Sequence, residues 1–180
     1  MLNSPVWRGP SQYAFCLGLI LGGLASALSL LVVGSIVRVA APSLVLIVVV
    51  LAWFGVIVVR EFGLVRFKLP QNARLVPQSV FRHGRFFGPL QFGLEMGTGV
   101  RTYVTSGLPY AALVLVLLIA EPAGAVAAGV AFGLGRSLMI TSNLRYSDDN
   151  SWDFAWSDHE RVIRMLLVAS FAVSLWVVLA

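Results

Sequence analysis

Three long apolar stretches decide what this chain can fold into, because each is long enough to cross a lipid bilayer. They run over Tyr13–Val37, Ser43–Val59 and Val162–Ala180. A transmembrane helix needs about 20 apolar residues, whereas a surface helix of a soluble protein needs a polar face that these stretches lack. Apolar residues make up 58% of the chain and charged residues 12%, unlike a soluble domain. The sequence predicts an all-α, polytopic integral membrane protein with a single transmembrane domain over residues 1–180.

The number of crossings depends on one interrupted segment. Phe86 to Ala120 is apolar but broken by glycines and Pro109, so it can form one long broken crossing or two short ones. Ala125–Thr141 forms a further crossing. The chain then has five spans, with its termini on opposite sides, or six, with both termini inside. We favour five, because Leu108–Glu121 makes a short helix for a separate crossing.

The chain divides into two N-terminal spans, a basic loop, and a broken-helix region followed by the C-terminal spans. These parts cover residues 13–59, 60–87 and 88–180. Shorter polar segments are expected as a tight turn at Arg38–Pro42, a second turn at Glu121–Gly124 and an aromatic, acidic loop at Ser142–Glu160. The N-terminal segment does not resemble a cleaved signal peptide, because the apolar run after it exceeds the usual length of about 7–15 residues.

Charge orients the chain in the cell membrane. The segment Arg60–Arg85 holds six basic residues against one acid, Glu61, and its net charge of +5 equals that of the whole chain. Short loops rich in Lys and Arg stay in the cytoplasm, so the loop over residues 60–87 is expected there. Its basic side chains are also candidates for contact with lipid headgroups: Arg66, Lys68, Arg74, Arg82 and Arg85. The side on which Ser142–Glu160 lies stays open, because acidic residues carry little topological weight.

A polar, glycine-rich segment, Gln91–Tyr110, is embedded in this apolar sequence and is the expected place of a working site. It carries the carboxylate of Glu95 and the guanidinium of Arg101. Charges at membrane depth are costly and face a cavity, a partner or each other, and glycine and proline there permit a broken helix. We expect the break between Gly97 and Pro109. The candidate polar site comprises Glu95, Thr98, Arg101, Thr102, Thr105 and Arg136.

Two interpretations of these charges are open. Glu95 and Arg101 are six residues apart, about 240° around an ideal helix, so a regular helix would not pair them. A break at Gly97–Gly99 could turn them toward each other, either as an ion pair that holds the break or as a site that handles substrate or protons. Arg136 lies near a membrane boundary, where it can belong to the same site or extend its charge toward water.

No residue pattern indicates covalent chemistry. Cys16 is the single cysteine, so no disulfide or cysteine-based zinc site can form within the chain. His83 and His159 lie far apart in sequence, and no phosphate-binding loop, Ser-His-Asp arrangement or nucleic-acid-binding module occurs. We therefore expect no catalytic residue, no metal site, no cofactor and no nucleic-acid partner, and the protein is not expected to be an enzyme.

The C-terminal half resembles a known family. A basic loop, the motif Phe92-Gly-Leu-Glu-Met-Gly-Thr-Gly-Val-Arg-Thr102, a proline break at Pro109 and the motif Phe132-Gly-Leu-Gly-Arg136 are similar to one half of the CcdA/DsbD-type transmembrane superfamily. The resemblance implies a proline-kinked helix beside a later glycine-rich helix. Members of that family transfer reducing equivalents through paired intramembrane cysteines, which this chain lacks. The resemblance therefore implies a shared scaffold without thiol chemistry.

Two classes of function follow. The first is a small carrier or transporter component with its polar site around Glu95–Arg101. The second is a non-catalytic accessory or anchoring subunit of a larger membrane complex, in which small-residue stripes such as Gly18, Gly22 and Ser26 contact other subunits. Transporters usually build their site from two repeats, and the Glu95–Pro109 pattern occurs once. Besides the lipid bilayer, the expected partners are copies of this chain or other membrane subunits.

Overall fold

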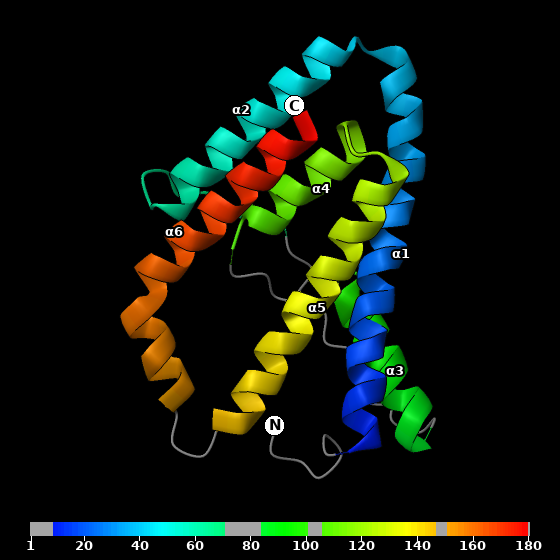
Figure 1. Cartoon of the computed structure of the whole chain (residues 1–180), viewed down its shortest axis with the longest axis vertical. Helices are drawn as coiled ribbons and strands as arrows, with labels where there is room; N and C mark the ends of the chain where they lie inside the picture. The colour runs from blue at the N-terminus through cyan, green and yellow to red at the C-terminus, as the bar shows by residue number, and fades with distance from the viewer. Residues whose placement is uncertain (1–8, 71–83, 101–105, 147–150, 180) are drawn as a thin grey trace.

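The computed structural model describes residues 9–70, 84–100, 106–146 and 151–179. Within these ranges the chain folds into six helices and no strand (Figure 1), which confirms the all-α prediction for this part of the chain. The helices are α1 (Pro10–Ala40), α2 (Ser43–Glu61), α3 (Gly84–Gly97), α4 (Leu108–Leu118), α5 (Pro122–Tyr146) and α6 (Ser151–Leu179).

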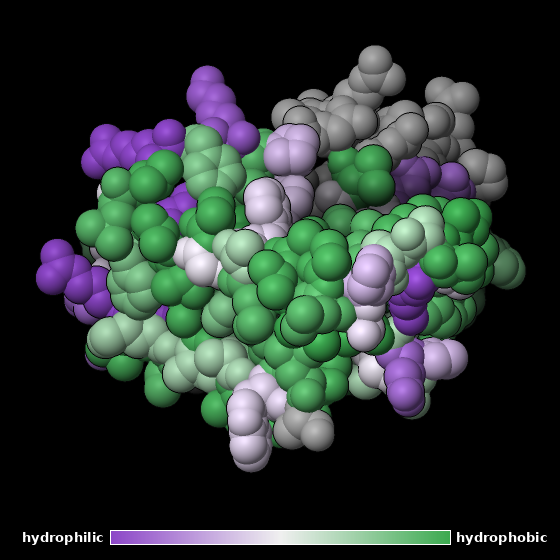
Figure 2. Space-filling view, turned by 90° about the horizontal axis from the view of Figure 1, so that it is seen from above, coloured by the Kyte–Doolittle hydropathy of each residue, from purple (hydrophilic) through white to green (hydrophobic). Residues whose placement is uncertain are grey.

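Four of these helices are long and apolar enough to cross a membrane, judged by length and composition over the described residues. They are α1, α2, Pro122–Ser142 of α5 and Trp156–Leu179 of α6, while α4 is apolar but shorter. Large apolar side chains cover much of the outer surface (Figure 2). Val39, for example, is 91% exposed and Trp176 is 70% exposed. A soluble monomer rarely exposes such wide apolar areas, so the surface is consistent with a membrane location.

Glycines bring α3 into backbone contact with the N-terminal half of α1. A Cβ added to Gly18 would lie 2.8 Å from the backbone nitrogen of Leu94, and one added to Gly97 would lie 2.8 Å from Cα of Leu19. Both distances are too short for any side chain, so only glycine permits this approach. The Ser11 hydroxyl donates to the carbonyl of Arg85 at the start of this contact, which shows that α3 runs in the same direction as α1.

A second glycine seam joins α1 to α5. A Cβ on Gly129 would lie 2.8 Å from the carbonyl oxygen of Gly23, and a Cβ on Gly133 would lie 2.7 Å from that of Leu19. Further along, the Ser137 hydroxyl lies 3.5 Å from the carbonyl oxygen of Cys16. The contacting residues decrease in residue number along α1 as they increase along α5, so the two helices are antiparallel.

Helix α4 packs on the C-terminal half of α1, where the Arg38 side chain of α1 forms hydrogen bonds with the C-terminal end of α4. The guanidinium of Arg38 donates to three carbonyl oxygens, those of Val116 (3.1 Å), Leu117 (3.3 Å) and Ala120 (2.8 Å). These acceptors lie in or after the last turn of α4, where carbonyls have no partner within the helix. Arg38 therefore caps the C-terminal end of α4. The turn expected at Arg38–Pro42 is shorter than predicted, because α1 continues to Ala40.

Helices α2, α4 and α6 form a second group beside α1 and α5 (Figure 1). Leu46 and Val50 of α2 cluster with Leu118 of α4 and Leu175 of α6. Nearer the other end of α2, the rings of Phe54 and Phe171 stack with centroids 5.1 Å apart. The C-terminal end of α6 thus packs against the N-terminal end of α2, so these two helices are antiparallel.

Several expected loops are shorter than the sequence indicated. Of the basic loop over residues 60–87, Arg60 and Glu61 belong to α2, and residues 84–87 belong to α3. The aromatic, acidic segment Ser142–Glu160 is also mostly helical, because α5 continues to Tyr146 and α6 begins at Ser151. Of the turn expected at Glu121–Gly124, only Glu121 precedes α5, which begins at Pro122. Proline is favourable at the first position of a helix, because the N–H that it lacks would have no partner there.

Candidate functional site

Helix α3 ends where the sequence predicted a break. Its last residue is Gly97, and Gly99 has a φ of +76°, a left-handed conformation that glycine adopts without steric cost and that commonly ends helices. The Thr98 hydroxyl donates to the carbonyl of Glu95 (2.8 Å), and the Ser26 hydroxyl of α1 donates to the carbonyl of Thr98 (3.0 Å). The end of α3 is thus tied to the middle of α1.

A cavity of about 550 Å³ opens beside this helix end. Its walls come from α1, α4, α5, the Thr98–Val100 turn and Pro70, and its lining is mostly apolar. Small residues such as Gly23, Ala27 and Ala128 leave the space open, and Phe132 and Leu113 complete the wall. Small-molecule sites are typically concave, mostly apolar and of about 300–1,000 Å³, with a few polar groups for orientation.

The cavity's polar groups are few. Ser26, Thr98 and Tyr110 line it, and the Tyr110 hydroxyl donates to the carbonyl of Pro70 (2.7 Å). The indole of Trp53 in turn donates to the carbonyl of Tyr110 (3.2 Å). Tyr110 is therefore held from two sides, which connects α4 to α2 and to the segment that follows α2.

The predicted polar site is only partly described. Glu95 is half-buried, and its Oε1 accepts a hydrogen bond from the Gln91 side chain one turn earlier (3.3 Å). Thr98 lies at the helix end and lines the cavity. Arg101, Thr102 and Thr105 lie outside the described residues, so the pairing of Glu95 with Arg101 stays a prediction. Glu95 itself does not line the cavity.

Arg136 lies on α5 one turn beyond Phe132. Its guanidinium carbon lies 5.8 Å from the centroid of the Phe132 ring, within the range of a cation–π contact. Phe132 lines the cavity and Arg136 does not. Arg136 therefore contacts a residue of the cavity wall without lining the cavity itself.

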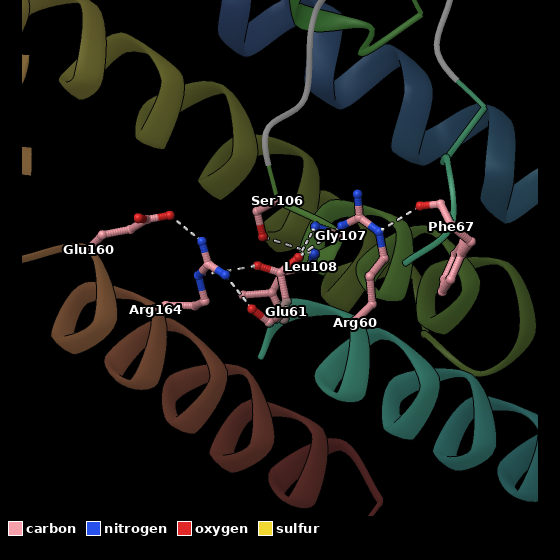
Figure 3. A network of polar contacts seen from close by, with 8 residues as sticks. All are labelled: Arg60, Glu61, Phe67, Ser106, Gly107, Leu108, Glu160 and Arg164. Carbon is pink, nitrogen blue, oxygen red and sulfur yellow. Dashed lines mark hydrogen bonds and ion pairs between the residues drawn. The ribbon is translucent and has the colours of Figure 1, made fainter. Parts of the chain in front are cut away.

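A buried carboxylate, that of Glu61, organises a polar network at the end of α2 (Figure 3). Its side chain is 5% exposed. Its Oε1 accepts hydrogen bonds from the backbone N–H of Gly107 (2.6 Å) and from Nη1 of Arg60 (3.2 Å). Gly107 directly precedes α4, so the carboxylate satisfies an N–H at the positive end of that helix.

Arg164 of α6 closes the network from the other side (Figure 3). Its Nε lies 4.0 Å from Oε2 of Glu61, and its two terminal nitrogens donate to the carbonyl of Glu61 and to the carboxylate of Glu160. One carboxylate thus joins the end of α2, the start of α4 and the middle of α6.

Glu61 was not among the predicted site residues, although the sequence contains a sign of it. It is the one acid in a strongly basic segment and lies two residues after a long apolar run. An acid at such a place has cations beside it, and it can cap a helix that begins nearby. Its partner Gly107 is 46 residues away in sequence, which no local pattern reveals.

The predicted headgroup contacts separate in space. Arg66 and Lys68 line a second cavity, of about 430 Å³, together with Arg60, Glu61 and Arg164. Arg85 lies apart from this cavity, at the start of α3, where its carbonyl accepts from Ser11. Arg74 and Arg82 lie outside the described residues.

The described part of the chain contains two cavities with different linings. Within it, no group of three or more His, Cys, Asp or Glu side chains is arranged to hold a metal ion. The two cavities differ in kind: the one at the helix break has a mainly apolar lining, and the one at the end of α2 is lined by five charged side chains.

Comparison with known proteins finds no relative: no family model, no curated protein and no solved structure matches this chain. The resemblance to the CcdA/DsbD-type superfamily therefore stays a prediction from the sequence.

Proposed function

We propose that this chain is an integral membrane carrier component that binds a small, mostly apolar molecule at the break between α3 and α4. The observation that carries the proposal is the 550 Å³ cavity, which has the broken helix as part of its wall. Interrupted helices in membranes are tolerated where they line a cavity, and transporters use such breaks as binding sites.

In this architecture α3 and α4 are two halves of one crossing. Both helices run in the direction of α1, with α3 on the N-terminal half of α1 and α4 on its C-terminal half. The break between them lies near Ser26, at the middle of α1. The chain then crosses the membrane five times, and the cavity lies near the midplane, where carriers place their substrate.

The nature of the lining suggests the class of substrate. A charged solute would need charged or many polar partners to replace its water, and the lining offers mainly aliphatic and aromatic side chains with the hydroxyls of Ser26, Thr98 and Tyr110. We therefore propose a substrate with an apolar body and a small polar group.

The alternative is a non-catalytic accessory or anchoring subunit, and one observation favours it. The apolar stretch of α6 is only 6% buried, which leaves a wide face for another membrane protein or for lipid. The glycine stripes argue the other way. Gly18, Gly22 and Gly97 make contacts within this chain, so they are not available to hold other subunits.

Cysteine accessibility tests the carrier proposal without knowledge of the substrate. In a Cys16→Ser background, Ser26→Cys places one thiol in the cavity, and reconstituted protein is treated with a small membrane-impermeant methanethiosulfonate from either side. We expect the thiol to react. Ala128→Phe, which fills the cavity, should block the reaction, whereas Ala127→Phe, on the exposed side of the same helix, should not.

The outcomes separate the alternatives. Reaction from both sides, blocked by Ala128→Phe alone, supports a carrier. A thiol that reacts from neither side, or equally in both phenylalanine variants, contradicts a water-accessible cavity at the break. Stable copurification with other membrane subunits, combined with an unreactive thiol, would favour the accessory subunit.

A further inference from the structure

We infer that the cavity at the end of α2 is a binding site for one anionic phosphate group, such as an acidic lipid headgroup and a soluble phosphate both carry. This inference does not depend on the carrier proposal, because the cavity is separate from the one at the helix break.

The charge of the cavity favours an anion. Arg60, Arg66, Lys68 and Arg164 line it against one carboxylate, that of Glu61. This carboxylate is already engaged by the N–H of Gly107 and by Arg60. If Glu160, which pairs with Arg164, is also counted, four basic groups face two acidic ones. The excess positive charge therefore favours the binding of an anionic ligand.

Arg66 and Lys68 supply this excess. Both side chains are exposed, and neither forms an ion pair with any other described residue. They follow α2 directly, on the segment that turns back at Gly63, which has a φ of +76°. Two cations that have no acidic partner among the described residues therefore line a cavity whose own carboxylate is already engaged.

Arg60 makes the cavity a defined site rather than a loose cluster of charge. Its Nε donates to the carbonyl of Phe67 (3.2 Å), and its guanidinium carbon lies 5.6 Å from the centroid of the Phe67 ring. Since Phe67 stands between Arg66 and Lys68, this contact holds the segment that carries both cations against the end of α2. A held guanidinium loses less freedom when an anion binds.

The position of the cavity suits a lipid headgroup. Helix α2 is followed directly by the basic segment that carries Arg66 and Lys68, so the cavity lies where an apolar helix gives way to a cationic segment. Basic pockets between membrane helices bind acidic headgroups.

The test counts bound ligand on the purified full-length chain. Native mass spectrometry in neutral detergent measures binding of phosphatidylglycerol, of zwitterionic phosphatidylcholine and of inorganic phosphate. One pocket variant carries Arg66→Gln, a second carries Arg66→Gln and Lys68→Gln together, and the control carries Arg161→Gln. All three side chains are exposed. The Arg66→Gln variant and the control each lose one positive charge, but only Arg66 and Lys68 line the cavity.

We expect one tightly bound phosphatidylglycerol per chain and no comparable phosphatidylcholine. At about fivefold per cation, Arg66→Gln should bind phosphatidylglycerol about fivefold more weakly and the double pocket variant roughly 25-fold more weakly, with the control changed by less than about twofold. Inorganic phosphate that binds alone with the same dependence on Arg66 and Lys68 would support the site and assign it to a soluble ligand. Equal losses in Arg66→Gln and Arg161→Gln, or equal binding of both lipids, would overturn the inference.

Discussion

Replacing Gly133 with alanine should separate α1 from α5, whereas the same change at Gly135 should not. The two glycines lie two residues apart on α5. A Cβ on Gly133 would lie 2.7 Å from the carbonyl oxygen of Leu19 and 2.8 Å from the backbone nitrogen of Ile20. A Cβ on Gly135 would meet nothing within 4 Å. Both positions are helical, so the pair isolates the steric term.

The magnitude follows from what each alanine gains and loses. Both substitutions gain the same helix propensity, about 0.5–1 kcal/mol relative to glycine. Only Gly133→Ala meets backbone atoms, which cannot rotate aside, so the helices must separate by roughly 1 Å to restore normal contact distances. Overpacking costs about 1–3 kcal/mol, and rigid neighbours place this case near the upper end. The two variants should therefore differ in free energy of unfolding by about 3 kcal/mol.

Reversible unfolding in mixed detergent and dodecyl sulfate micelles, followed by tryptophan fluorescence, measures this difference. We expect Gly135→Ala to be as stable as the parent or slightly more stable, and Gly133→Ala to be clearly less stable. Equal stability of the two variants would refute the close α1–α5 seam, and with it the helix arrangement around the cavity.

Three further substitutions test other contacts with the same unfolding assay. Arg38→Gln should cost about 1.5–3 kcal/mol, because the last carbonyls of α4 lose their cationic donor; no more loss than in Arg161→Gln would contradict this role. Glu61→Ala should cost about 2–3 kcal/mol, because the Gly107 N–H loses its buried acceptor, and Glu61→Gln should cost less, because an amide oxygen can still accept that bond. Cys16→Ser should change stability by less than about 0.5 kcal/mol, since Ser137 contacts the carbonyl of Cys16 rather than its thiol; a larger loss would show that the thiol matters.

The helical fold was largely readable from the sequence. Long apolar runs allow few structures other than helices that cross a membrane, and the small residues at Gly18 and Gly22 marked a face suited to close helix contact, which the structure fills from within the chain. A stripe of small residues does not name its partner, however. In the structure, α3 packs against one face of α1 and α5 packs against the neighbouring face. This arrangement depends on contacts between segments far apart in sequence, which the spacing of residues within one helix cannot reveal.

The ends of helices were harder to predict, for a physical reason. Residues 151–160 are polar, which indicates exposure to water but does not exclude a helix, and they form the start of α6. The network around Glu61 was missed because it joins three segments through one side chain. Within the polar segment, the end of α3 at Gly97 was predictable, because a run of glycines weakens any helix.

The side of the membrane on which each terminus lies is the most direct test of the proposed architecture. If α3 and α4 together make one discontinuous crossing, the chain crosses five times and its termini lie on opposite sides. Short epitope tags at Met1 and Ala180 can be tested for protease access in intact and permeabilised spheroplasts. The predicted result is that one tag is cleaved in intact spheroplasts and the other only after permeabilisation. Both tags on the same side would mean an even number of crossings, and would contradict a discontinuous α3–α4 crossing as the wall of the binding cavity.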